Sequence, residues 1–240
     1  MLTAEIAECL RRLRFNSNIA EMSEKIHAEN NQQYLLELLK SEILRRESSK
    51  KDRLLKNAGF YTIKSFEDFN FDEVTLPEAV TKEYLKNLEF LESKTNIVMY
   101  GNVGTGKTFL SISLGVMACK HGIEVKFFRT SALVNKLAEA KKNNTLSSLM
   151  KQISKAGLLV CDEWGYVPLD RIGAQLLFEV VSECYERKSL IINTNIEFSR
   201  WVNVFYDEQM TGAIIDRVLH HCHLLLFPGP SNRIRESTLT

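Results

Sequence analysis

The segment from Ile97 to Ser111 constrains the fold of this 240-residue chain most, because it combines an apolar strand pattern, a glycine-rich loop and a helical pattern. The loop has the spacing G-x-x-x-x-G-K-[ST], which is typical of phosphate-binding loops. Glycines let such a loop curl so that its N–H groups face phosphate oxygens, and the following helix N-terminus adds partial positive charge. The binding residues that we predict are Gly101, Asn102, Val103, Gly104, Thr105, Gly106, Lys107, Thr108 and Phe109.

Within this loop, Lys107 and Thr108 carry the most specific chemistry. The lysine can reach the β- and γ-phosphates of a nucleotide, and the threonine hydroxyl can bind Mg²⁺. The sequence therefore predicts a site for ATP and magnesium.

Apolar runs alternate with helical patterns from residue 96 onward. The runs cover residues 96–100, 123–128, 157–161, 189–193 and 223–227. This alternation predicts an α/β fold, in which a parallel five-stranded sheet lies between helices. Only helical periodicity precedes residue 60. We therefore predict a small all-helical N-terminal domain over 1–58, a linker over 59–77 and an α/β domain over 78–240.

Two carboxylates follow a predicted buried strand that ends at Cys161. Ligands of open α/β sheets bind at the carboxyl ends of the strands, where Asp162 and Glu163 would stand. Asp162 could hold Mg²⁺, and Glu163 could deprotonate a water for attack on the γ-phosphate. The alternative is an acidic pair that only faces solvent. Asn195 follows the next buried strand, so it could contact the same water or the phosphate.

Basic residues later in the chain have two interpretations each. Arg217, beside Asp216, and Arg233, near the C-terminus, could form surface ion pairs or contribute charge at a transferring phosphate. A lysine-rich helical stretch between two predicted strands is either a solvated face or a DNA-binding surface. Its lysines are Lys136, Lys141, Lys142, Lys151 and Lys155.

Composition narrows the class of protein. Hydrophobic residues make up 45% and charged residues 25%, as in soluble globular proteins, and no apolar run reaches the length of a membrane span. Five cysteines without a C-x-x-C pair predict reduced thiols and a cytoplasmic protein.

The run from His220 to His223 raises the question of zinc. Neighbouring side chains rarely converge on one ion, so we expect a helix end entering a strand there instead.

Several motifs together resemble the IstB family of transposition helper ATPases, which are initiator-type AAA+ proteins related to the DnaC helicase loaders. These motifs are the glycine loop, "LLVCDEWGYVPLD", "LIINTN", "FSRWVNVFYDEQMTGAIIDRVLHH" and "GPSNRIRE". The similarity runs over nearly the whole chain. It departs from the family pattern at Asn232, where the family has tyrosine, and at Asn193-Thr194-Asn195, where the family has T-S-N.

The resemblance implies a function and a partner set. Such proteins bind ATP and Mg²⁺, assemble as homo-oligomers on duplex DNA in rings or helices, and help a partner transposase insert an element at its target. By position, Asp162 and Glu163 are the Walker B pair, Asn195 is sensor 1, and Arg217 is an arginine finger supplied by a neighbouring subunit. Arg233 matches an arginine of the closing motif. The resemblance also implies that the helical lid of full AAA+ modules is absent.

Two other functions compete with this interpretation. A DnaC-like helicase loader would use the same ATPase with a different client. A small-molecule P-loop kinase would need an acceptor pocket in place of Glu163, and the helical N-terminal region argues against it. The sequence therefore favours an ATP-hydrolysing, DNA-binding transposition helper.

Overall fold

The computed structural model describes residues 2–16, 18–205 and 207–232. The chain forms two compact units, Met1–Arg53 and Leu54–Thr240. The sequence-based boundaries at residues 58 and 77 stay predictions. None of the helices in the described residues combines the length and the apolar character needed to cross a membrane.

The first unit is helical. It contains α1 (Leu2–Arg12), α2 (Asn18–Ser23) and most of α3 (Asn31–Asn57). Leu10, Ile19 and Ala20 form its small buried cluster. The buried Glu42 carboxylate stabilises α3, because it accepts hydrogen bonds from Arg45 and Arg46 of the same helix. Chiefly through the bond from Arg45, this pairing lowers the pKa of the Glu42 carboxyl to about 2.

The second unit is built on a five-stranded sheet in the order β2-β3-β4-β1-β5. All neighbouring strands are parallel, which confirms the predicted sheet. The strands are β1 (Asn96–Gly101), β2 (Val125–Arg129), β3 (Leu158–Trp164), β4 (Ser189–Thr194) and β5 (Cys222–Phe227). Their carboxyl ends share one edge of the sheet, as parallel pairing requires.

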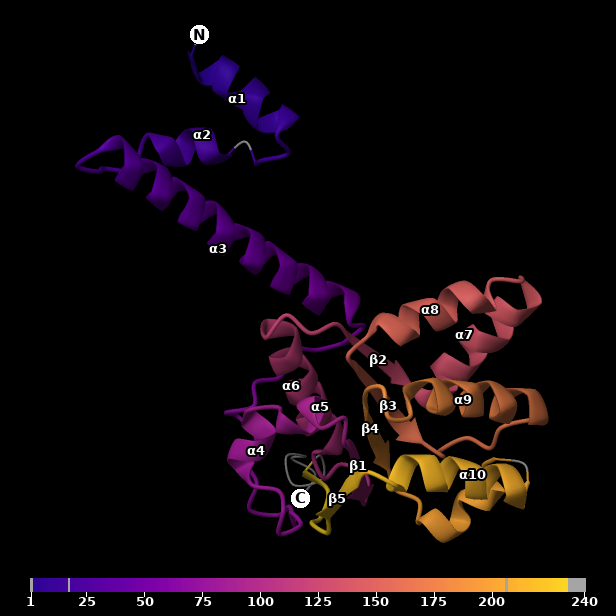
Figure 1. Ribbon diagram of the computed structural model, residues 1–240. Helices are drawn as coiled ribbons and strands as arrows, with labels where there is room; N and C mark the ends of the chain where they lie inside the picture. Colours follow the sequence, from indigo (N-terminus) through magenta and orange to yellow (C-terminus); the bar gives the residue numbers. More distant parts are fainter. Residues whose placement is uncertain (1, 17, 206, 233–240) are drawn as a thin grey trace, which may run out of the picture. The chain divides into compact units, whose positions relative to one another are not determined.

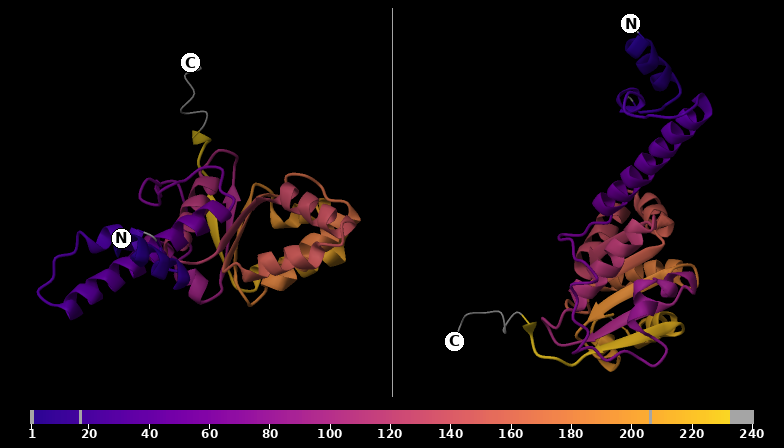
Figure 2. Two further views of the ribbon diagram at one scale, coloured as in Figure 1. Left: turned by 90° about the horizontal axis from the view of Figure 1, so that it is seen from above. Right: turned by 90° about the vertical axis from the view of Figure 1, so that its left-hand side faces the viewer.

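Helices cover both faces of this sheet (Figure 1). One face packs against α4 (Lys82–Lys86), α5 (Glu89–Glu92) and α6 (Lys107–Lys120). The other face packs against α7 (Thr130–Lys142), α8 (Leu146–Lys155), α9 (Arg171–Cys184), a 3-10 helix (Phe198–Asn203) and α10 (Glu208–Leu219). The view from above in Figure 2 shows the two helical layers on opposite sides of the strands.

Alternation along β1 explains this two-sided burial. Ile97 and Met99 enter the core on the α6 side, whereas Val98 enters the core on the α9 side. Successive strand residues point to opposite faces, so a strand covered on both sides must be apolar throughout. The continuous apolar runs in the sequence are the direct consequence.

The segment before α4, residues 58–81, packs on the α6 side of the sheet. Phe66 and Phe71 are buried there, and Thr75 pairs with Leu226 through an antiparallel bridge at the edge strand β5. This segment therefore belongs to the core of the second unit. After β5, the described residues run only to Asn232 and contain no helical lid domain.

Candidate nucleotide-binding site

The glycine loop lies between β1 and α6 at the carboxyl edge of the sheet. Three of its glycines have positive φ, at +154° for Gly101, +81° for Gly104 and +98° for Gly106. A Cβ at Gly101 would lie 2.2 Å from the backbone oxygen of Phe227 in β5. Glycine is therefore required at this position by both conformation and space.

Lys107 opens α6 and folds back over the loop. Its ammonium donates hydrogen bonds to the carbonyl oxygens of Gly101 at 2.7 Å and Asn102 at 2.6 Å. The positive end of the α6 dipole lies at the same point. Positive charge and N–H donors thus gather where the loop curls, which is the chemistry that a polyphosphate requires.

Asp162 forms the centre of the site's polar contacts. The Thr108 hydroxyl donates to its two carboxylate oxygens at 3.0 and 3.2 Å, and the Asn193 amide donates at 2.9 Å. Asp162 is only 4% exposed, and no lysine or arginine in the described part of the chain forms an ion pair with it. The hydrogen bonds to this buried carboxylate come from neutral donors, which do not balance its negative charge. Burying a charge without a counter-charge costs free energy.

This arrangement fits a magnesium ion. Thr108 and Asp162 supply the hard oxygen ligands that Mg²⁺ prefers, beside a loop suited to phosphates. In addition, the Asn193 Oδ1 oxygen is buried without a hydrogen-bond partner among the described residues. Thr108 and Asp162 would hold the ion, directly or through water, and the ion would neutralise phosphate charge when bound.

Glu163 occupies a different environment from its neighbour. It lies within β3, which continues to Trp164, whereas the sequence suggested a strand ending at Cys161. A register shift in the β3–β4 pairing between Cys161 and Trp164 accompanies a φ of +55° at Glu163. Regular alternation along β3 already places Asp162 on the α6 side, whereas the irregularity leaves the Glu163 side chain 47% exposed. Two adjacent carboxylates are thereby given separate surroundings.

Arg129 at the end of β2 is a site residue that the sequence did not reveal. Its Nε lies 3.8 Å from the Glu163 carboxylate, and its guanidinium lies 5.5 Å from the Tyr61 ring centroid. A lone arginine after a strand carries no recognisable pattern. Only the β2–β3 pairing, in which Arg129 is opposite Asp162, brings it to the site.

A cavity of about 650 Å³ opens over these groups. Its walls include six of the predicted loop and helix residues, Val103 to Thr108, and also Phe109, Asp162, Glu163 and Asn195. Tyr61, Thr62 and Lys64 from the segment before α4 complete one side. The Lys64 ammonium lies 4.9 Å from the Phe109 ring centroid. The structure therefore brings together predicted residues from three strand ends.

The remaining predicted residues lie elsewhere. Arg217 is in the last turn of α10, where it donates to the Ala213 carbonyl and lies 4.8 Å from the Phe178 ring centroid. It does not line the cavity of its own chain. The five predicted lysines of α7 and α8 are exposed. Arg233 lies outside the described residues, although its predecessor Asn232 donates to the Gly104 carbonyl.

Comparisons with known proteins identify a family and several relatives. The profile of the family described as IstB-like ATP binding protein matches residues 9–240. A putative ATP-binding protein of insertion sequence IS232 from Bacillus thuringiensis subsp. berliner is 36% identical, over 84% of this chain and 81% of its own length. The corresponding IS21 protein from Pseudomonas aeruginosa is 35% identical, over 86% of this chain and 78% of its own.

Among solved structures, AMPPCP-bound DnaA from Aquifex aeolicus has a similar fold. The TM-score is 0.56 and the sequence identity is 22%, with coverage of 70% of this chain and 51% of the DnaA chain. This chain therefore spans about half of DnaA. The likeness shows a shared fold.

The contacts of Asn193 generate a stability prediction. Asn193 is 2% exposed and donates to Asp162 and to the Ser111 hydroxyl, whereas Asn195 is exposed at the cavity wall. Replacing Asn193 by alanine removes one of the donors to the buried Asp162 carboxylate and the donor to the buried Ser111 hydroxyl, so Asn193→Ala should lower the free energy of unfolding by about 1–3 kcal/mol. Urea unfolding monitored by tryptophan fluorescence measures this. The matched variant Asn195→Ala should change stability by no more than about 0.5 kcal/mol, and equal effects of the two variants would contradict the assignment.

Proposed function

The chain belongs to the IstB-like ATP-binding protein family, and on that premise we propose that it hydrolyses ATP, assembles on duplex DNA and assists a transposase in target selection and insertion. The observation that carries the proposal is the contact between Thr108 of the glycine loop and the buried Asp162, with Glu163 exposed at the same cavity. The relatives named as insertion-sequence proteins support the transposition context. The AMPPCP-bound state of the DnaA neighbour supports ATP as the nucleotide.

The two carboxylates would divide the chemistry. Asp162, with Thr108, would hold Mg²⁺ against the β- and γ-phosphates. Lys107 would exchange its bonds with the loop carbonyls for bonds with phosphate oxygens. Glu163, which is free of the core, would accept a proton from the attacking water, and Asn195 would orient that water or the γ-phosphate. Arg129 would fix the Glu163 carboxylate until the nucleotide is in place.

The position of Arg217 supports a composite active site. In this fold α10 returns from the carboxyl edge, after β4, to the amino edge, before β5. Arg217 lies nine positions after Glu208, which is about 14 Å along the helix. It is therefore carried away from the cavity of its own chain. A neighbouring copy docked against this end of α10 could receive Arg217 at its γ-phosphate, which would make ATP hydrolysis depend on assembly.

The direct test measures ATP turnover and particle size over a range of protein concentrations, with and without duplex DNA. Turnover per chain should rise with protein concentration, and DNA should raise it further by gathering copies side by side. Arg217→Ala should bind ATP almost normally and hydrolyse it slowly, because the charge that it offsets develops mainly in the transition state. Turnover that is independent of concentration and of DNA would contradict the proposal.

Mixing provides the control for a shared site. Arg217→Ala and Glu163→Gln proteins, each inactive alone, should recover part of the activity together, since some mixed interfaces pair an intact Glu163 with an intact Arg217. If assemblies shown to be mixed recover no activity, the shared site is contradicted. Arg217 would then act only within its own chain, where it packs over the Phe178 ring.

We expect duplex DNA to bind at the exposed lysines of α7 and α8. Phosphate contacts release counterions, so affinity should fall steeply with salt. Removing Lys136, Lys141 and Lys142 together should reduce the slope of log affinity against log salt by about 2 to 3.

Fluorescence anisotropy with labelled duplexes of unrelated sequence measures the slope. A matched variant without three other exposed lysines, Lys56, Lys94 and Lys120, should keep the wild-type slope. Equal slopes for all three proteins would show that DNA binds to another surface.

A further inference from the structure

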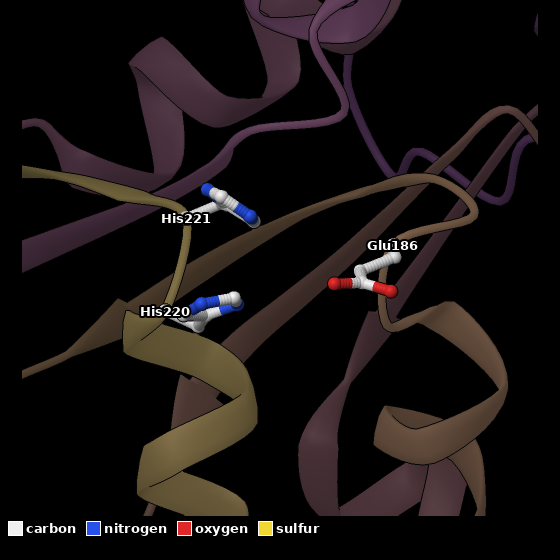
Figure 3. Close-up of side chains that lie close together, drawn as sticks. All are labelled: Glu186, His220 and His221. Atoms are coloured by element: carbon white, nitrogen blue, oxygen red, sulfur yellow. The ribbon is translucent and has the colours of Figure 1, made fainter.

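Three side chains with metal-binding chemistry meet at the end of the sheet opposite the nucleotide cavity. Glu186 lies in the turn between α9 and β4, and His220 and His221 lie between α10 and β5. Their ligand atoms all lie within 4.8 Å of one another. Figure 3 shows the Glu186 carboxylate and the two imidazole rings around a common space. The sequence suggested that neighbouring histidines would diverge, but the two rings lie only 4.2 Å apart at their centroids.

We propose that Glu186, His220 and His221 form a surface site for a divalent transition-metal ion of the zinc class. Two imidazoles and one carboxylate are ligands that such ions take, and a fourth position would stay open to water or a partner group. Metal–ligand bonds of about 2.0–2.2 Å at the tetrahedral angle place two ligands of one ion about 3.3–3.6 Å apart. The exposed side chains therefore need to close by up to about 1.5 Å.

The backbone on the histidine side is held in place by a buried residue. Asn96, which is 7% exposed, donates from its backbone N–H to the His221 carbonyl and from its side chain to the Val218 carbonyl. Its side-chain oxygen accepts from the Leu190 N–H in β4. One residue thus ties the histidine turn to the strand that follows Glu186, so the spacing between the two segments is built into the fold.

A second buried residue fixes the turn that carries Glu186. Lys188 is 6% exposed, and its ammonium donates to the carbonyl oxygens of Ile153 and Ser154 at the end of α8. The turn between Cys184 and Lys188 contains Glu186 at φ +56°, which is costly for a residue with a Cβ. Such strain persists only where its surroundings enforce it. Here it accompanies a carboxylate directed toward the histidines.

Electrostatics and the surroundings of His220 favour a cation at this point. Helix α9 ends two residues before Glu186, and α10 ends directly before His220, so two helix C-termini with partial negative charge converge (Figure 3). The Tyr185 hydroxyl lies 2.9 Å from His220 Nδ1. A hydrogen bond of this kind restrains the ring and leaves its other nitrogen to coordinate an ion.

The site is distinct from the magnesium position at Thr108 and Asp162, both in its ligands and in its edge of the sheet. A nitrogen-containing ligand set selects zinc, cobalt or nickel over magnesium. The ion would connect the turn after α9 to the end of α10, the helix that also carries Arg217. It would thereby add a cross-link between the ends of two helices that already pack against each other.

The test uses Co²⁺ as a spectroscopic probe. The full chain, without a polyhistidine tag, is stripped with chelator and titrated with Co²⁺ in excess Mg²⁺, which keeps the nucleotide site filled with the harder ion. We expect a single ion with visible absorption typical of nitrogen and oxygen ligands. Zn²⁺ should displace it and raise the melting temperature. His220→Ala and Glu186→Gln should each weaken binding by about tenfold or more.

A matched control is available in His121, an exposed histidine at the end of α6. His121→Ala should bind Co²⁺ as the wild type does. Circular dichroism of each variant establishes that the fold is kept. No saturable uptake by the wild-type chain, or unchanged uptake by His220→Ala/His221→Ala, would overturn the proposal. A thiolate-to-cobalt charge-transfer band would place the ion on Cys222 and would equally overturn this ligand set.

Discussion

The hydrogen bond between Thr108 and Asp162 is the contact on which the candidate site depends. It joins the first turn of α6 to β3, an interior strand of the sheet, so the glycine loop is fixed relative to that strand. Asn193 adds a second bond from β4, and Thr130 donates to the Asp162 backbone carbonyl from the start of α7. One buried residue of β3 therefore receives hydrogen bonds from three other elements. A charged group in such a place is costly unless a cation balances it, which is the reason to expect Mg²⁺ there.

The register shift at the end of β3 explains how adjacent acidic residues can have different roles. In a regular strand, Asp162 and Glu163 would point to opposite faces of a sheet that is covered on both sides. The positive φ at Glu163 instead releases its side chain to the cavity, within reach of Arg129. Backbone strain at this position is thus linked to the exposure that a proton acceptor requires.

Sequence patterns predicted the strands well because strands covered on both sides must be apolar throughout, and they predicted the loop because its spacing is specific. They missed residues whose role arises only from packing. Asn193 is a polar residue inside an apolar run, and its contacts depend on the β3–β4 register. Arg129 reaches the site through strand pairing. Glu186 meets His220 and His221 only after α9 and α10 end at the same edge, so a search for contiguous ligands does not find it.

We infer that Asp162 holds the metal, whereas Glu163 acts only in the chemical step. The measurement that tests it most directly is ATP affinity as a function of Mg²⁺ concentration for the wild type, Asp162→Asn and Glu163→Gln. We expect Asp162→Asn to lose about tenfold or more of the ATP affinity that Mg²⁺ adds to the wild type. Glu163→Gln should keep that gain and yet hydrolyse ATP at least about 10²-fold more slowly. The same Mg²⁺ dependence in all three proteins, or wild-type hydrolysis by Glu163→Gln, would contradict it.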